Sequence, residues 1–400
     1  MILLQAHQIK PKVYWVGGID WDIRNFHGYT THRGTTYNAY LIIDKKIVLV
    51  DTVKHYLFDE MLARIRTVID PAKIDYIISN HVEMDHSGSL LKLVDVAPDA
   101  TIVTSTQGEK GLQRHYKKNW KLQVMRSGDT LDIGKRTLHF VHIPMVHWPD
   151  SMVTYSLSDK LLLPNDAFGQ HIASSERFDD ELGWAVVREE AAKYYANIVL
   201  PYGGQVQKAL AAVTALDIDM IAPSHGVIWR SHIADIIKEY TQWASHETKQ
   251  RAVIVYDSMW GSTERIAHAL WEGMEAEGIP VTMRNLKTTH ISDVITDVLL
   301  SKMVLLGSPT LNNGMLPTMG AFLTYLKGLR PQNRIGFVFG SYGWGGQAVG
   351  DIEKILNDLS WDLPEKSVNI NYVPDGSELN EVKNIGKKIA RYYESTKKQK

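Results

Sequence analysis

The second half of the chain alternates short apolar runs with segments long enough to form helices. Strands that are each separated by a helix run parallel, and the crossovers place helices on both faces of their sheet. We therefore expect an α/β domain with a doubly wound, parallel, five-stranded sheet over residues 249–400, a normal size for one domain. The five predicted strands are Ala252–Tyr256, Val281–Leu286, Met303–Leu306, Ile335–Phe339 and Val368–Val373.

The first half has a different pattern of predicted elements. Short β-like runs alternate with turns and a few helices from Val13 to about Ala222. Its clearest element is a hairpin, because two β-branched runs, Ala39–Ile43 and Ile47–Val50, flank a polar turn. This pattern predicts a separate, strand-rich domain.

An amphipathic helix and a polar linker close the first half. Ser231 is suited to the N-cap of this helix, and Ser245–Arg251 is polar throughout and is interpreted as a linker. The sequence thus predicts two domains, over residues 1–248 and 249–400. The apolar face of the helix comprises Ile233, Ile236, Ile237, Tyr240 and Trp243.

Composition excludes several classes of protein. The chain has 400 residues and no cysteine, so it has no disulfide, catalytic thiol, Cys-ligated zinc or fused Cys-ligated iron–sulfur module. A net charge of −1 gives no electrostatic reason to bind nucleic acid or an anionic membrane. No signal-peptide core and no run of about 18 apolar residues is present, so we expect a cytoplasmic protein.

The strongest chemical signal is a group of four potential metal ligands within six residues. His81, Glu83, Asp85 and His86 directly follow the apolar run Tyr76–Ile78. A strand that ends in a loop can turn these side chains toward one point, whereas a continuing strand would divide them between two faces. Their nitrogen and oxygen donors predict a metal site.

Three later residues, His147, Asp166 and His225, also stand just past apolar runs. Taken alone, each has an ordinary interpretation; Asp166, for example, could be a helix N-cap. Taken with the first group, they give four imidazoles and three carboxylates. That set is large enough for two metals with one carboxylate between them.

Three turns of the second half suggest a nucleotide-like ligand. Ser258–Thr263 links a strand to a helix, where small hydroxyl residues and free N–H groups can hold a phosphate; the loop contains no Lys or Arg, which favours a monophosphate over a Walker loop. A simple capped helix is the alternative for this loop alone. Gly307–Gly314 and Gly340–Gln347 follow strands of the same sheet, so the turns meet at its carboxyl edge. Their glycines allow close approach to a flat ring, on which Tyr342 and Trp344 could stack.

Both halves are similar to one known family. His81 to His86 resembles the His-x-His-x-Asp-His signature of the metallo-β-lactamase fold, with Glu83 in place of the second histidine. This variant and the stretch His147–Met152 resemble the flavodiiron proteins over essentially the whole chain. The resemblance implies a metallo-β-lactamase-like αββα sandwich followed by a flavodoxin-like domain. It further implies one iron on His81, Glu83 and His147, a second on Asp85, His86 and His225, and Asp166 as the bridge.

The resemblance to flavodoxin implies that the three turns bind FMN. The residues implied for the phosphate are Ser258, Met259, Gly261, Ser262 and Thr263. Those implied for the isoalloxazine are Pro309, Thr310, Asn312, Gly314, Ser341, Tyr342, Gly343, Trp344 and Gly346.

By the same resemblance, the chain is expected to reduce dioxygen to water, nitric oxide to nitrous oxide, or both. The implied electron donor is a separate rubredoxin or reduced coenzyme F420. The implied assembly is a head-to-tail homodimer, and a dimer of dimers is also open. His27, His171 and Tyr195 are candidate proton donors, although a packed structural role is equally open for each.

Two other functions remain in view. The first is a zinc hydrolase of the metallo-β-lactamase fold with an appended flavodoxin-like domain; Glu83 and the flavin turns count against it, because zinc cannot accept electrons. The second is an electron carrier whose first domain holds no metal, against which the seven ligand positions argue. The sequence does not choose between dioxygen and nitric oxide, between donors, or between dimer and tetramer.

Overall fold

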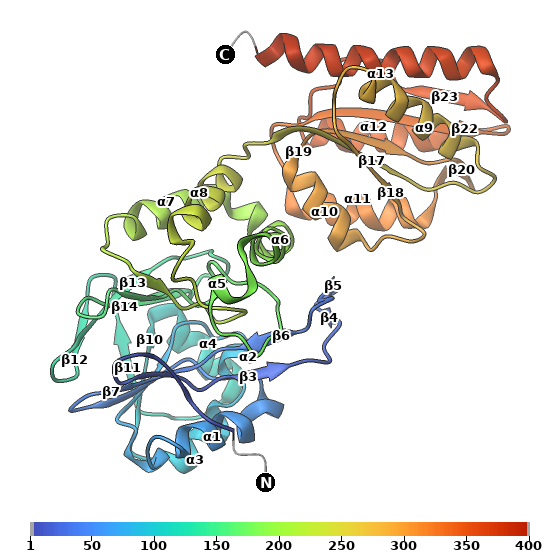
Figure 1. The fold of residues 1–400 in the computed structure, drawn as a ribbon. Helices are drawn as coiled ribbons and strands as arrows, with labels where there is room; N and C mark the ends of the chain where they lie inside the picture. Colours follow the sequence, from blue (N-terminus) through green and yellow to red (C-terminus); the bar gives the residue numbers. More distant parts are fainter. Residues whose placement is uncertain (1–3, 398–400) are drawn as a thin grey trace. The chain divides into compact units, whose positions relative to one another are not determined.

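The computed structural model describes residues 4–397. Contacts divide the chain into two compact units, shown as ribbons in Figure 1. Among these residues, the first unit comprises residues 4–194 and Tyr202–Ala244, and the second comprises Tyr195–Pro201 and residues 245–397.

The first unit contains two large sheets. One has seven strands and the other five, and buried side chains of both form a single core. Helices α1 (Phe58–Arg66) and α3 (Leu90–Val96) lie on one side of the sheets, and α7 (Gly203–Val213) and α8 (Ile233–Ala244) on the other (Figure 1). This arrangement is the predicted αββα sandwich.

Both sheets of the first unit contain antiparallel and parallel strand pairs. The spatial order of the first sheet is β1 (His7–Lys10), β2 (Val13–Trp15), β7 (Tyr40–Ile43), β8 (Ile47–Val50), β9 (Tyr76–Ser79), β10 (Thr101–Ser105) and β11 (Leu122–Met125). That of the second is β12 (Thr130–Asp132), β13 (Thr137–His142), β14 (Met152–Ser156), β15 (Leu161–Leu163) and β16 (Met220–Ile221). The predicted hairpin is present as the antiparallel pair β7–β8.

The predicted N-cap of α8 was wrong, because the helix begins at Ile233 and not next to Ser231. The start of the helix is instead held by a side chain distant in sequence. Asp179 accepts hydrogen bonds from the backbone N–H groups of Ser231 at 3.2 Å and His232 at 2.7 Å. A local sequence pattern cannot show such a cap.

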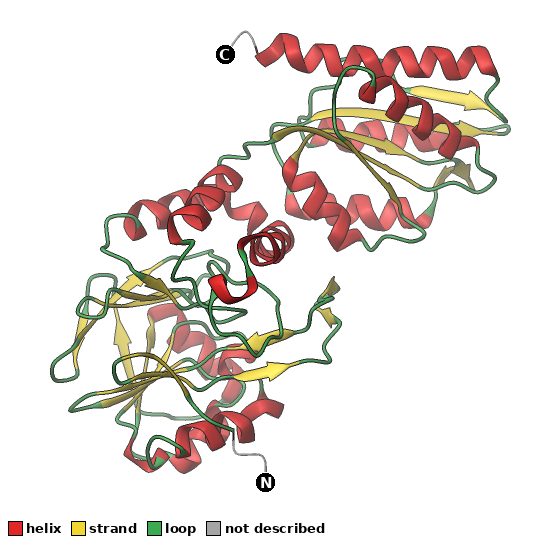
Figure 2. Cartoon of the chain, in the orientation of Figure 1, coloured by secondary structure: helices red, strands yellow, loops and turns green. Residues whose placement is uncertain are grey.

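The second unit contains the predicted parallel five-stranded sheet (Figure 2). Its spatial order is β18, β17, β19, β22, β23, which in chain order is 2-1-3-4-5, the order of flavodoxin-like sheets. Helices α9 and α13 lie on one face of this sheet, and α10 and α11 on the other. The strands are β17 (Lys249–Tyr256), β18 (Val281–Asn285), β19 (Ser301–Gly307), β22 (Ile335–Tyr342) and β23 (Val368–Asn371). The helices are α9 (Ser262–Glu275), α10 (Ile291–Leu300), α11 (Pro317–Leu329), α12 (Gln347–Asp358) and α13 (Gly376–Lys397).

The strand ends of the second unit differ from the sequence prediction by one to three residues, and two differences concern the junction between the units. Strand β17 begins at Lys249, inside the predicted linker, and Lys249 pairs with Ser301 beyond an irregularity in the ladder. Backbone pairing does not depend on apolar side chains at the exposed start of a strand, so polarity misplaced this boundary. Segment Tyr195–Pro201 also groups with the second unit, where Asn197 donates to the carbonyl of Ser292 at 3.0 Å.

Among residues 4–397, no helix is both long enough and apolar enough to span a membrane.

Candidate functional site

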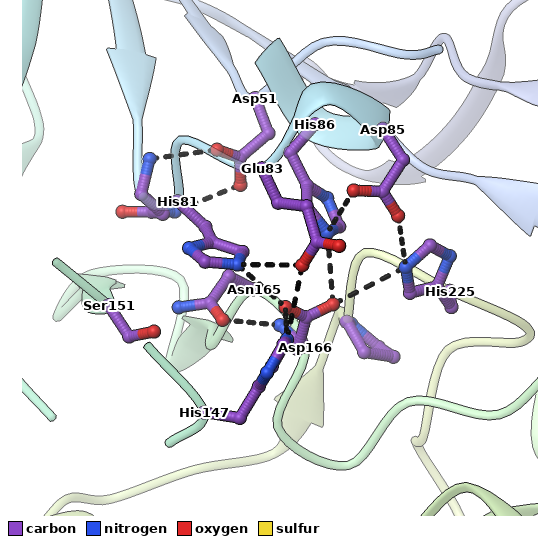
Figure 3. A network of polar contacts seen from close by, with 12 residues as sticks. Asp51, His81, Glu83, Asp85, His86, His147, Ser151, Asn165, Asp166 and His225 are labelled. Carbon is purple, nitrogen blue, oxygen red and sulfur yellow. Dashed lines mark hydrogen bonds and ion pairs between the residues drawn. The ribbon is translucent and has the colours of Figure 1, made fainter. Parts of the chain in front are cut away.

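The predicted metal ligands converge on one point of the first unit (Figure 3). Four come from the loop after β9 and from the single helical turn α2 (Met84–Ser87), and the others follow β13, β15 and β16. Strands of two packed sheets thus deliver their C-terminal loops to the same place. The seven residues form two groups, one of His81, Glu83, His147 and Asp166, and one of Asp85, His86 and His225.

The first group, which we name the His81 subsite, surrounds a space suited to one metal ion. His81 Nε2 and His147 Nε2 each lie 3.4 Å from Glu83 Oε2. The same two nitrogens lie 3.5 and 3.3 Å from Asp166 Oδ2. Ligand atoms about 2.1 Å from a shared metal are themselves roughly 3–3.5 Å apart, so the spacing fits.

The second group, the His86 subsite, uses the other oxygen of Asp166. His86 Nε2 and His225 Nε2 lie 3.0 and 3.3 Å from Asp166 Oδ1. Asp85 supplies Oδ1 at 3.4 Å from His86 and Oδ2 at 3.2 Å from His225. Asp166 therefore turns one oxygen toward each group, which is the arrangement a bridging carboxylate requires.

Several buried atoms of this cluster lack a hydrogen bond. Among the described residues, both carboxylate oxygens of Asp85, Oδ2 of Asp166 and Nε2 of His86 are buried without a hydrogen-bond partner. Buried polar atoms without partners are costly, and buried charges more so. Metal ions between these atoms would satisfy all of them, so the residues fit a two-metal centre.

The metal-free cluster binds protons strongly. Burial opposes the charged form of His147, but its close contacts with the carboxylates of Asp166 and Glu83 outweigh burial and raise the pKa to about 9. Burial likewise opposes the charged form of His225, and its close contacts with the carboxylates of Asp166 and Asp85 raise its pKa to about 10. Burial would raise the pKa of Asp166, but the facing imidazoles, above all His86, hold it well below its ordinary value. Metal ions must therefore displace protons.

Loading the metal-free protein with ferrous iron at pH 7.5 should release at least about two protons per chain, from His147 and His225. Calorimetry in two buffers of different ionisation enthalpy measures this release, and equal heats in both would contradict it.

The metal-free protein should also lose stability at high pH. A histidine whose pKa is higher in the folded state stabilises that state fully when the pH is below its unfolded-state pKa of about 6.5. This stabilisation is lost as the pH rises through the folded-state pKa values of about 9 and 10.

Two predicted proton donors lie beside the cluster. His27 is 70% exposed in its side chain, and its Nε2 lies 3.1 Å from Glu83 Oε1. His171 is fully buried, shares a 2.7 Å hydrogen bond with Thr35 Oγ1, and its ring centre lies 5.0 Å from that of His225. Burial and the charge of His225 hold the pKa of His171 well below its ordinary value. His27 thus lies between Glu83 and solvent, and His171 is a buried, neutral neighbour of His225.

The third predicted donor, Tyr195, groups with the second unit, whereas its neighbour Tyr194 belongs to the first. Tyr194 ends α6 (Trp184–Tyr194) and donates its hydroxyl to Asp166 Oδ1 at 2.9 Å. A π-helical turn, Tyr195–Val199, follows at once. Sequence reasoning did not name Tyr194, because adjacent residues of a helix point in different directions and no local signal shows which of two tyrosines faces the cluster.

The carboxyl edge of the second unit's sheet holds a cavity of about 620 Å³. The three predicted turns all contribute to its wall. Two indoles, Trp260 and Trp344, are 94% and 93% exposed at its edge, and such open aromatic faces suit stacking on a flat ring. Of the residues predicted for FMN, the cavity is lined by Ser258, Met259, Ser262, Pro309, Thr310, Asn312, Ser341, Tyr342, Gly343 and Trp344.

Four predicted residues, Gly261, Thr263, Gly314 and Gly346, do not line the cavity. Two of them shape it. Gly261 precedes α9 with a φ of +86°, and Thr263 shares a 2.9 Å hydrogen bond with Ser341 that joins two of the turns. The lining residues that sequence reasoning missed are Trp260, Leu311, Asn313, Gly345, Tyr372 and Val373.

The cavity fits FMN in size and polarity. Its volume lies within the range of about 300–1,000 Å³ for cofactor pockets. Gly261 offers no side chain to cap α9, so N–H groups at the start of this helix are available to a phosphate. Lys287, outside the loop, donates to the carbonyl of Ser258 and adds a positive charge beside it.

Comparison with known proteins identifies both units. Residues 35–226 match the family described as ODP family beta lactamase, and residues 254–385 match the family described as flavodoxin. The chain is 45% identical to the nitric oxide reductase of Moorella thermoacetica, over 96% of this chain and 98% of that protein. It is 41% identical to the rubredoxin-oxygen oxidoreductase of Megalodesulfovibrio gigas, over 97% and 98%. It is 40% identical to the oxidase of reduced coenzyme F420 of Methanothermobacter marburgensis, over 96% and 98%.

Solved structures agree with these relatives. The rubredoxin oxygen:oxidoreductase of Desulfovibrio gigas superposes with a TM-score of 0.96 at 41% identity, covering 98% of this chain and 99% of that one. The flavodiiron protein of Giardia intestinalis gives a TM-score of 0.95 at 35% identity, covering 97% and 96%. The predicted fold and the predicted cofactors, FMN and a diiron centre, are thereby confirmed. The chain belongs to the flavodiiron protein family and is an FMN- and iron-dependent oxidoreductase.

Proposed function

We propose that this chain reduces dioxygen to water, nitric oxide to nitrous oxide, or both, in the cytoplasm. The observation that best supports the proposal is that the two carboxylate oxygens of Asp166 face two different ligand groups. The same chain also has a cavity large enough for a flavin. The relatives named above support it, because they are named as a nitric oxide reductase, a rubredoxin-oxygen oxidoreductase and an oxidase. Nothing in these comparisons favours the zinc hydrolase.

The seven ligand positions would hold the two irons as the resemblance implies, with Asp166 between them. When bound, FMN stores up to two electrons and the reduced diiron centre two more, which matches four electrons per dioxygen and two per pair of nitric oxide molecules. Glu83 and His147 are each 15% exposed in their side chains, whereas Asp85, His86 and His225 are at most 3% exposed. The His81 subsite therefore faces the more open side.

This chain's own residues would supply and hold protons at that open side. His27, next to Glu83, can carry a proton between solvent and the ligand edge. Tyr194 donates a hydrogen bond to Asp166 and so steadies the carboxylate between the two subsites. His171, kept neutral by burial, packs against His225 without adding positive charge.

In the second unit, the loop Ser258–Thr263 would bind the FMN phosphate, and the turns around Pro309 and Tyr342 would surround the isoalloxazine. The electron donor would be a separate protein or cofactor, of the kinds named for the relatives, namely rubredoxin or reduced coenzyme F420. The chain itself has no cysteine with which to hold a rubredoxin-type iron.

Steady-state assays with each gas and each donor test this function. The purified, metal- and flavin-loaded protein should consume dioxygen or nitric oxide when supplied with reduced rubredoxin or reduced coenzyme F420. Boiled protein and protein without donor are the controls. No consumption of either gas, even with chemically reduced FMN, would reject the function.

We further propose a head-to-tail homodimer in which each flavin serves the partner's diiron centre. A two-fold dimer makes both flavin–iron contacts through identical surfaces. Co-expression of an Asp166→Ala chain with a Ser262→Asp chain should then restore roughly a quarter of wild-type activity, because half the dimers are mixed and each keeps one working pair. Activity no higher than that of either variant alone, with mixed dimers present, would contradict this assembly.

A second co-expression gives the matched control. Wild type is paired with a chain that carries both Asp166→Ala and Ser262→Asp. If electrons pass between chains, only the dimers of two wild-type chains are active, which gives about a quarter of full activity. If electrons stay within a chain, every wild-type chain is active, which gives about half. The two experiments together distinguish the models even if one variant assembles poorly.

A further inference from the structure

The two metal subsites have matching ligands, but the histidine rings of His81 and His225 are hydrogen-bonded to different groups through their Nδ1 atoms, on the side away from the subsite. Each has two histidines, one carboxylate of its own and one oxygen of Asp166. The ring of His81 is backed by a carboxylate, since its Nδ1 lies 2.9 Å from Asp150 Oδ2. The ring of His225 is backed by a neutral group, since its Nδ1 lies 2.8 Å from the backbone carbonyl of Thr36.

Asp150 is firmly held where it meets His81. It is 4% exposed and lies in the connection between β13 and β14. The oxygen that meets His81 also accepts a hydrogen bond from the backbone N–H of Val82 at 2.8 Å. The main chain of Asp150 is tied in turn, because Ser105 Oγ donates to its carbonyl at 2.7 Å. One carboxylate oxygen thus fixes both the ring and the loop of a metal ligand.

These contacts determine which nitrogen of the His81 ring carries the hydrogen and which one faces the subsite. A carboxylate can only accept, so Nδ1 of His81 carries the hydrogen and Nε2 presents its lone pair to the subsite. A negative charge on the far side of the ring also increases the electron density that the ring can donate. The carbonyl of Thr36 fixes the same tautomer in His225 but adds no full charge.

A second buried carboxylate, Asp51, lies near the ligands. It interacts electrostatically with His86 and, less strongly, with His81, and its oxygens accept hydrogen bonds from the N–H and the side-chain amide of Asn80. His27 meets Glu83 from the exposed side. Among the described residues, Asp150 is the carboxylate outside the ligand set that bonds directly to a ligand ring.

We propose that Asp150 is a positioning residue that makes the His81 subsite bind iron more tightly than the His86 subsite, so that the first iron enters there. This inference depends on the proposed assignment of the seven ligands. It concerns which subsite fills first, which is independent of the gas that the protein reduces.

Anaerobic titration with iron isotopes tests the order of filling in the unmodified protein. Metal-free, FMN-loaded chain receives one equivalent of ferrous ⁵⁷Fe, and a Mössbauer spectrum is recorded before any second equivalent is added. We expect one predominant doublet, matching that of a His225→Ala chain, which keeps the His81 subsite complete. Two doublets of equal intensity, or a doublet unlike that of His225→Ala, would overturn the proposal.

The variant Asp150→Asn then tests the cause. The amide has the size of the carboxylate but no charge, and loss of such an outer partner typically weakens metal binding about 10- to 100-fold. We expect that loss at the His81 subsite alone, with the first equivalent of iron now divided between the subsites or moved to the His86 subsite. Unchanged affinities, or equal losses at both subsites, would contradict the role of Asp150.

A matched control removes a buried carboxylate that touches no ligand. Asp179 is fully buried and accepts from backbone N–H groups at the start of α8, so Asp179→Asn should reduce stability and leave both iron affinities unchanged. FMN content and thermal unfolding of each variant show that it is folded. A wild-type chain that reduces neither gas but fills its subsites in order would reject the proposed function and retain this inference; one that binds no iron would overturn both.

Discussion

Replacing Asp166 by alanine should reduce gas-reducing activity at least about 100-fold while FMN stays bound and reducible. Loss of an outer partner of a metal ligand already costs about 10- to 100-fold, and Asp166 is the one residue that both subsites share. The flavin unit has its own buried core, so its cofactor should be unaffected.

The measurement combines steady-state gas consumption with iron and flavin analysis of the same preparation. Asp235→Ala is the matched control, because that carboxylate is 57% exposed in its side chain and pairs with His232 on the surface. Full activity with two irons in Asp166→Ala would show that Asp166 does not bridge the metals.

Introducing aspartate at Ser262 should have the opposite effect, loss of FMN with retention of iron. Ser262 lines the cavity at the first residue of α9, where the phosphate is expected. Two like charges about 4–5 Å apart repel by about 3–4 kcal/mol at an effective dielectric constant of 20, which lowers affinity at least about 100-fold. Aspartate in the first turn of a helix is favourable in itself, so the fold should be preserved.

Titration of the flavin-free protein with FMN, followed by fluorescence quenching, measures the affinity. Ser262→Asn is the control, since it has the size of aspartate without its charge and should bind FMN far more tightly than Ser262→Asp. Equal affinities for the two variants would remove Ser262 from the phosphate site.

The sequence predicted best those features whose signals are local. The ligands from His81 to His86 stand within six residues at the end of a strand, and the flavin turns each follow a strand of one sheet, so position along the chain implied position in space. The later ligands, such as His225, had little signal when taken alone and were found through their shared placement after apolar runs and through the resemblance to a family.

The features that the sequence did not predict depend on contacts between distant residues. Asp179 caps α8 from about fifty positions away, and Asp150 meets His81 across 69 positions. The sequence prediction named Tyr195 and not its neighbour Tyr194, whose hydroxyl donates to Asp166 across 28 positions. Tyr372 lines the flavin cavity just after β23, at a position that the sequence prediction placed inside a strand. Local periodicity contains no information about such contacts.

Iron, zinc and flavin content of the purified protein test the central claim most directly. Protein is purified from cells grown with iron and denatured, and the released metals and flavin are quantified. We expect two irons and one FMN per chain, in agreement with the two ligand groups and with the cavity at the carboxyl edge of the second unit's sheet. Stoichiometric zinc without flavin would contradict the assignment of this chain as a flavin- and diiron-dependent oxidoreductase.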